Sequence, residues 1–319
     1  MDEYVYIVIL NWKGAEDTIA CLKSLSLLEG VKYRVVICDN NSLDGSYELI
    51  RDKVGEIPVF CEKKLVELTR FDAESYDIEN EDAVYLIQTG DNLGFSGGNN
   101  VGIRFSLNQA DMSYVWLLNN DTEVTPKSLY HMVERSQSDE TIGICGSRMV
   151  YHHDRTILQG LGGTYNRWLG TTRHYAAYKA SNTVFDDDEV SSQIDYVIGA
   201  SMLIKKELLE TVGLLCEDYF LYFEELDITC RAFSAGFKHS ISTNSIVFHK
   251  EGGSTGHVLK KSKCSDLLSI KNRIVFSEKF YPKYTFFVRI GLLGVILNRL
   301  KRKQFDRAVY ILKVFFGSA

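Results

Sequence analysis

The 319-residue chain lacks the cysteine pattern, the long apolar run and the leader that would place it outside a cell or across a membrane. Its seven cysteines are scattered, and no two have the C-x-x-C spacing of zinc or redox sites. An odd number of cysteines fits a reducing compartment better than a disulfide framework. No apolar stretch reaches the roughly 20 residues that span a bilayer, and acidic residues stand where a signal peptide would be basic. We therefore expect a cytoplasmic protein.

An excess of basic charge is also missing. The net charge of −6 argues against nucleic acid as a partner, because such proteins usually present a basic face. The hydrophobic content of 45% and the charged content of 24% are ordinary for a folded protein and argue against disorder. A chain of this length can bury one large core or two smaller ones.

Two widespread nucleotide-binding motifs are absent as well. The Gly-Lys-Ser/Thr of a P-loop does not occur, and the glycines of residues 92–100 do not match G-x-G-x-x-G. A dinucleotide dehydrogenase is therefore disfavoured. A nucleotidyltransferase is disfavoured too, since residues 11–14 (Asn-Trp-Lys-Gly) do not supply the glycine-rich, basic signature expected near its first strand.

Strand and helix signals alternate along most of the chain. Apolar strand-like runs occur at 4–10, 33–38, 83–88, 114–118, 197–205 and 245–248, and helix-like periodicity at 17–28, 46–54, 100–108, 125–136, 206–212 and 224–235. Such alternation predicts a Rossmann-like α/β fold, with a mostly parallel sheet flanked by helices. The charged stretch 61–83 is interpreted as a surface insertion with a short helix at 63–69.

Polar residues follow several of these strands, at the edge where open α/β sheets bind ligands. Residues 119–122 (Asn-Asn-Asp-Thr) follow one strand, and their hard oxygens suit Mg²⁺ or Mn²⁺ on a diphosphate. Asp39, which is followed by Asn40, Asn41 and Ser42, can accept hydrogen bonds from a ribose or a base. The glycine-rich segment 92–100 lets backbone approach a ligand, and the helix amides beyond it favour anions. Each segment alone is also typical of an ordinary turn.

Acidic residues at 224, 225 and 227 open a later helix. They can simply complement the helix dipole, and Asp227 can pair with Arg231 one turn on. Alternatively one of them is a general base. Glu224 and Asp227 share a helical face, whereas Glu225 points about 100° away. The aromatic residues 219–223 before them offer an apolar wall that would raise a carboxyl pKa. His249 ends a strand before a glycine-rich loop, where a metal ligand could lie, although a lone histidine is more often structural.

In this order, the motifs resemble the family 2 glycosyltransferases of the GT-A fold, especially the rhamnosyltransferase-like branch. The matching residues span roughly 4–275. They are Val8-Ile9-Leu10-Asn11-Trp12, Asp39-Asn40-Asn41-Ser42, Asp44-Gly45, Asn92 to Asn99, Leu117 to Thr122, Gly199-Ala200, Phe223 to Asp227, and His249 with Gly253-Ser254.

The resemblance implies inverting transfer of a sugar from dTDP-rhamnose or a UDP-hexose to a hydroxyl of a glycan or lipid-linked acceptor, in bacterial cell-surface polysaccharide synthesis. It makes Asp121 and His249 ligands of Mn²⁺ or Mg²⁺, and Glu225 the base, with Asp227 as the alternative. The first acid of the family's Asp-x-Asp is here the amide Asn119. The implied donor-binding residues are Asn11, Asp39, Asn41, Asn92, Gly94, Phe95, Gly98, Asn99, Asn119 and Asn120.

The expected organisation is a GT-A domain over residues 1–264 and a helical, basic amphipathic segment over 265–319. Within the domain, residues 1–125 would bind the nucleotide and 126–264 the acceptor. The last segment is typical of a helix that binds a membrane surface, here at the inner face of the cell membrane. It is equally typical of a packing or homodimerising helix pair. The alternative function is a non-catalytic sugar-nucleotide-binding subunit of a glycan-assembly complex.

Overall fold

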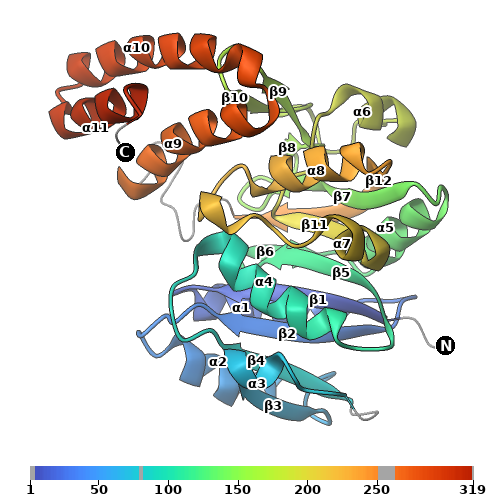
Figure 1. Cartoon of the computed structure of the whole chain (residues 1–319). Helices are drawn as coiled ribbons and strands as arrows, with labels where there is room; N and C mark the ends of the chain where they lie inside the picture. Colours follow the sequence, from blue (N-terminus) through green and yellow to red (C-terminus); the bar gives the residue numbers. More distant parts are fainter. Residues whose placement is uncertain (1–3, 79–81, 251–262, 318–319) are drawn as a thin grey trace.

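A mixed sheet of ten strands lies at the centre of the computed structural model, which describes residues 4–78, 82–250 and 263–317 (Figure 1). The strand order is β3-β4-β2-β1-β5-β11-β7-β12-β6, with β8 on β7. The strands are β1 Tyr4–Asn11, β2 Tyr33–Asp39, β3 Lys64–Thr69, β4 Ala83–Gln88, β5 Met112–Asn119, β6 Thr122–Val124, β7 Ile142–Tyr151, β8 Leu158–Gly160, β11 Ser201–Lys205 and β12 Lys238–His249; β9 Gly163–Asn166 and β10 Thr171–His174 form a separate hairpin.

Five strands from β3 to β5 are parallel, so their carboxyl ends meet at one edge. Side chains of β1 alternate between two cores: Tyr6 and Val8 pack with α4, and Val5 and Ile7 pack with α1 and α2. The sheet is therefore covered on both faces. The helices are α1 Ala15–Leu25, α2 Ser46–Val54, α3 Arg70–Ala73, α4 Gly94–Leu107, α5 Ser128–Gln137, α6 Asp187–Gln193, α7 Lys206–Val212, α8 Glu224–Ser234, α9 Lys263–Phe280, α10 Thr285–Lys301 and α11 Phe305–Phe315.

The interpretation of 63–69 as a surface helix is wrong. Residues Lys64–Thr69 form β3, which pairs in parallel with β4 along its whole length. Val66 and Leu68 are buried while Glu67 between them is exposed. This alternation has the period of a strand with one covered face. The strand also lies at the edge of the sheet, where charged side chains are common.

The C-terminal helices α9, α10 and α11 form a small core of their own at the far end of the molecule from β3 (Figure 1). Ile270 and Ile274 of α9 pack there against Val288 and Leu292 of α10. Among the described residues, none of the helices combines the length and apolar character that crossing a bilayer requires.

Candidate active site

Asp121 and His249 meet because β6 pairs with the end of β12. Thr122 lies opposite His249 in this antiparallel pair, and Asp121 is the residue just before it. The Nε2 atom of His249 is 3.1 Å from Oδ1 of Asp121, and both residues are buried. Behind the ring, Nδ1 of His249 lies 2.9 Å from Oε1 of Gln159. The sheet thus joins two residues that are more than 100 positions apart.

This pair fits a divalent cation. When the Gln159 oxygen accepts a hydrogen bond from Nδ1–H, the neutral ring presents the Nε2 lone pair to the Asp121 carboxylate. Two lone-pair atoms at this distance need a cation or a proton between them. No cluster of three or more such ligands occurs in residues 4–78, 82–250 and 263–317. The pair therefore suits a metal whose remaining ligands come from phosphate oxygens and water.

The end of β2 is held by a buried hydrogen-bond network. The side chains that donate to the Asp39 carboxylate are Asn11 at 2.7 Å, Ser42 at 2.6 Å and Gln88 at 3.1 Å. Asn41 follows in the left-handed region, with φ of 55°. Asp39 and Asn11 are fully buried in this network, so they fix the loop after β2 from within. Any contact with a nucleotide would have to share these oxygens.

Asn119 and Asn120 lie between the β2 loop and the Asp121–His249 pair. The Asn120 amide is buried and donates to the carbonyl oxygen of Gly14 at 3.1 Å. Asn119 is half-buried, and its backbone N–H donates to the carbonyl oxygen of Ala200 at 3.0 Å. Asn120 therefore ties β5 to the loop after β1, while Asn119 ties it to residue 200.

The glycine-rich segment has a different role from the one expected. Helix α4 begins at Gly94, six residues earlier than expected, so its glycines lie inside the helix. A Cβ on Gly98 would be 2.4 Å from Leu10, and one on Gly102 would be 2.6 Å from Val8. Because these glycines face β1, they allow close packing of α4 on the sheet, and Gly98 has this packing role whether or not it also contacts the donor. Asn99 is buried in the same helix.

The first amides of α4 are already used within the protein. Asn40 Oδ1 accepts the N–H of the N-cap residue at 3.0 Å, and Asn92 Oδ1 accepts that of Gly94 at 3.1 Å. The N–H of Phe95 donates to the carbonyl oxygen of Phe220 at 2.6 Å. These three amides do not form the open anion site that the sequence suggested. Instead they fix the aromatic loop 219–223 against α4.

The aromatic loop is strained and is held from outside. Phe220, Tyr222 and Phe223 all have φ between 60° and 78°, a region that residues with side chains rarely adopt. The buried amide of Asn272 on α9 lies 2.9–3.1 Å from the carbonyl oxygens of residues 219, 221 and 222. Asn272 therefore stabilises the loop conformation that leads into α8.

Glu225 lies beside Gly199, two residues before β11, the strand that pairs with β5. A Cβ on Gly199 would be 3.9 Å from the Cβ of Glu225, and the next residue, Ala200, accepts the Asn119 N–H. Burial raises the pKa of the half-buried Glu225 carboxyl. The pKa of Glu224 is also raised, by its burial and by the charge of Glu225. Each has one buried oxygen, Oε2, without a hydrogen-bond partner among the described residues.

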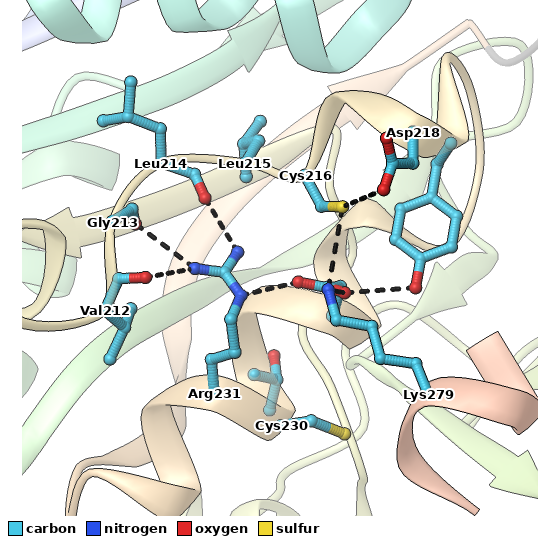
Figure 2. Close-up of polar contacts among 12 residues, drawn as sticks. Val212, Gly213, Leu214, Leu215, Cys216, Asp218, Cys230, Arg231 and Lys279 are labelled. Carbon is cyan, nitrogen blue, oxygen red and sulfur yellow. Dashed lines mark hydrogen bonds and ion pairs between the residues drawn. The ribbon is translucent and has the colours of Figure 1, made fainter. Parts of the chain in front are cut away.

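Asp227 has a different environment on the same helix. Its fully buried carboxylate is 2.6 Å from Arg231 Nε and 2.6 Å from Lys279 Nζ, and it accepts the Tyr219 hydroxyl at 3.1 Å. The expected Asp227–Arg231 pair is therefore present. Figure 2 shows Arg231 reaching on to backbone oxygens of the 212–214 turn, while Lys279 enters from α9. Asp227 thus joins α8 to the C-terminal helices.

Sequence reasoning missed Gln159, Asn272 and Lys279. Each comes from a segment outside the recognised motifs and acts on a motif residue far away in the chain. Local sequence patterns contain no signal for such contacts. A cavity of about 540 Å³ also exists, but Tyr4, Gly30 and Ser113 line it at the amino ends of β1 and β5. It lies at the opposite edge of the sheet from Asp121 and is therefore not part of the candidate active site.

Comparisons with known proteins agree with this arrangement. The family model for Glycosyl transferase family 2 matches residues 5–213. The low-salt glycan biosynthesis hexosyltransferase Agl10 of Haloferax volcanii is 24% identical over 318 residues, which cover 98% of this chain and 89% of that protein.

Two solved structures share the fold. The mannosyltransferase PcManGT from Pyrobaculum calidifontis, in complex with GDP-Man and Mn²⁺, has a TM-score of 0.59 at 11% identity, covering 98% of this chain and 86% of that one. Residues 1–349 of S. aureus TarS have a TM-score of 0.56 at 12% identity, covering 99% and 80%. These likenesses support the GT-A fold with C-terminal helices.

Proposed function

This chain belongs to glycosyl transferase family 2 and is a glycosyltransferase, and from that premise we propose that it transfers a sugar with inversion from a nucleoside diphosphate to an acceptor hydroxyl. The observation that carries the proposal is the position of Glu225. Its carboxylate has a buried oxygen with no hydrogen-bond partner among the described residues, and it lies beside Gly199, whose neighbour Ala200 accepts the N–H of Asn119 at the end of β5. A general base needs such an oxygen free for the proton of the attacking hydroxyl.

In the proposed reaction, Oε2 of Glu225 takes the proton of the acceptor hydroxyl. The hydroxyl oxygen bonds to the anomeric carbon while the bond from that carbon to the diphosphate breaks. Attack from the face opposite the diphosphate inverts the configuration. Because burial raises the pKa of Glu225, its ionised form is a stronger base than an exposed carboxylate. Asp227 is the weaker candidate, since three donors already occupy its oxygens.

Asp121 and His249 are proposed to hold Mn²⁺ or Mg²⁺. When bound, such an ion would neutralise charge on the diphosphate leaving group. Asn119 and Asn120 end the same strand and are proposed to face the donor, as are Asn41 and Asn92 from neighbouring loops. Residues 1–125 then form the nucleotide-binding half and 126–264 the acceptor-binding half.

The proposed donor is dTDP-rhamnose, as in the rhamnosyltransferase-like branch, or a nucleoside diphosphate hexose. The hexosyltransferase relative supports the hexose, and the mannosyltransferase neighbour adds GDP-mannose to the candidates. The proposed acceptor is a glycan or lipid-linked hydroxyl in glycan assembly, in a bacterial cell envelope or an equivalent setting.

Thermal unfolding with dTDP-rhamnose, UDP-glucose, UDP-galactose, UDP-N-acetylglucosamine and GDP-mannose tests the donor. One donor should stabilise the wild type in the presence of Mn²⁺ by about 3 kcal/mol at a hundredfold excess over Kd. Asp121→Ala should lose this stabilisation, while the exposed control Asp52→Ala keeps it. Stabilisation of Asp121→Ala by the same donor and Mn²⁺, equal to wild type, would refute the metal assignment.

A non-catalytic subunit would behave differently. It would bind the donor but form no glycoside with any hydroxyl acceptor, so Glu225→Gln would change its stability without changing any transfer rate. Product formation by the wild type and its loss in Glu225→Gln would exclude that alternative.

A further inference from the structure

Helix α10 is apolar on two opposite faces. Val288 and Leu292 on one face are buried in the core shared with α9 and α11. On the other face, large apolar residues recur at intervals of four, three, four and three, so they form one stripe along the helix. These are Phe286, Ile290, Leu293, Leu297 and Leu300, each between 42% and 67% exposed. A helix that is apolar all round is ordinarily covered all round.

Other segments extend this apolar surface. Trp168, in the turn between β9 and β10, is half exposed and packs edge-on against Tyr284 and Phe287, with ring centroids 4.8 and 4.9 Å apart. Helix α11 carries a stripe of its own, in which Phe305 and Val309 are the first two exposed residues. Two segments more than 100 residues apart therefore place exposed aromatic rings side by side.

The charge of this region is opposite to that of the rest of the chain. Residues 281–319 contain eight Lys and Arg and one Asp, a net charge of +7, which leaves −13 on residues 1–280 of a chain with net charge −6. Arg299 and Arg307 pair with Asp266, and Arg289 pairs with Glu278. The remaining five basic residues have no ion pair within the described part of the chain: Lys283, Lys301, Arg302, Lys303 and Lys313.

Three of these basic residues stand together. Lys301 ends α10, Arg302 and Lys303 follow it in the turn to α11, and all three are exposed. The apolar stripe of α10 ends next to them at Leu300, and the stripe of α11 begins just after them at Phe305. Apolar and cationic side chains thus share one exposed end of the helical hairpin.

We propose that the α10 stripe, with Trp168 and the 301–303 turn, docks on the surface of an anionic lipid bilayer. Burial of the apolar stripe among the lipid headgroups and attraction of the basic turn to anionic lipids act together in such a contact. The helix lies in the surface, since none of the described helices can cross the bilayer. A second copy of this chain is a poorer occupant, because the same positive charge would meet itself.

The surface does not include Glu225 or Asp121, so it stands apart from the proposed donor and base. It is nevertheless connected to them, since α9 packs against α10 and carries Asn272, whose amide holds the aromatic loop. Docking through α10 would therefore keep Glu225 and Asp121 close to a membrane-bound acceptor.

Flotation of the full chain with vesicles tests the proposal. The wild type should float with phosphatidylcholine–phosphatidylglycerol vesicles, less so at high salt, and should not float with phosphatidylcholine alone. Lys301→Gln/Arg302→Gln/Lys303→Gln should lower partitioning by about 100-fold, as three lost charges near an anionic surface imply. The matched control Lys23→Gln/Lys127→Gln/Lys179→Gln removes the same charge elsewhere and should partition as wild type.

The apolar part is tested by Phe286→Ser/Leu297→Ser, which should also stop flotation while thermal unfolding shows the fold retained. No flotation of the wild type with anionic vesicles would overturn the proposal. Equal loss in the Lys23/Lys127/Lys179 control would overturn it as well. A third result would also overturn it: the wild type forms a concentration-dependent dimer in sedimentation, Phe286→Ser/Leu297→Ser abolishes the dimer, and the wild type does not bind vesicles. The stripe would then be covered by a second copy of the chain.

Discussion

Replacing Glu225 by Gln tests the proposed base and the free energy needed to bury it. Burial raises the pKa of Glu225 from 4.5 to about 7. At 1.36 kcal/mol for each pKa unit, this shift corresponds to roughly 3 kcal/mol. The folded state binds the proton more tightly than the unfolded state. The contribution of Glu225 to wild-type stability is therefore fully present below about pH 4.5 and is lost as the pH rises through about 7.

The Gln variant keeps the shape of the protonated carboxyl but has no charge to bury. Urea unfolding should give equal stability for the two proteins near pH 4, and a variant more stable by roughly 3 kcal/mol near pH 8.5. Its transfer rate should fall by about 10²–10⁴-fold with donor affinity unchanged. The wild-type rate should rise with pH and level off above about pH 7.

The control is Glu210→Gln, because Glu210 is exposed on α7. It should match the wild type in stability at both pH values and in rate. If Glu225→Gln is no more stable than wild type near pH 8.5, the inference that burial raises the pKa of Glu225 is refuted. A Glu225→Gln variant that transfers sugar at the wild-type rate would refute its role as base.

Three further substitutions test the surroundings of the site. Asp227→Asn should lower the free energy of unfolding in urea by about 3–5 kcal/mol, because it leaves two cations beside a neutral group, while the folded fraction keeps most of its rate. Asn272→Ala should lower stability by about 1–3 kcal/mol through unsatisfied buried carbonyl oxygens, and should lower kcat at unchanged donor affinity; equal kcat would refute its positioning role. Gly98→Ala should lower Tm with a loss of about 1–3 kcal/mol. Gly55→Ala should not, since no described atom lies within 4 Å of its added Cβ.

Much of the structure of residues 1–125 could be predicted from the sequence. Residues Ala83–Gln88 and Ser46–Val54 form the expected strand and helix. Strands β1, β2 and β5 are each longer than expected by one to three residues. Strands that are buried on both faces must be almost entirely apolar, and they end where polar residues begin. The same rule predicted that Asp39 and Asn119 would lie at one edge of the sheet.

Other features could not be predicted because they depend on the neighbouring element. The charges of Lys64–Thr69 suggest surface, and only pairing with β4 makes it a strand. The glycines of α4 suggest a loop that binds a ligand, and only their contact with Leu10 and Val8 of β1 gives them a packing role. A local pattern specifies which conformations are allowed, whereas packing determines which one is used.

By itself, the sequence determined the alternating α/β order, the strand ends that carry Asp121 and His249, and an acidic start to α8. It left Glu225 and Asp227 as alternatives, since both are carboxylates on one helix. The tertiary structure distinguishes their environments. Lys279 and Tyr219 come from other elements and donate to the Asp227 carboxylate. Glu225 is desolvated beside Gly199, and one of its oxygens has no partner in the described part of the chain. Burial and pairing depend on groups that are distant in the chain, so only the folded protein can set them.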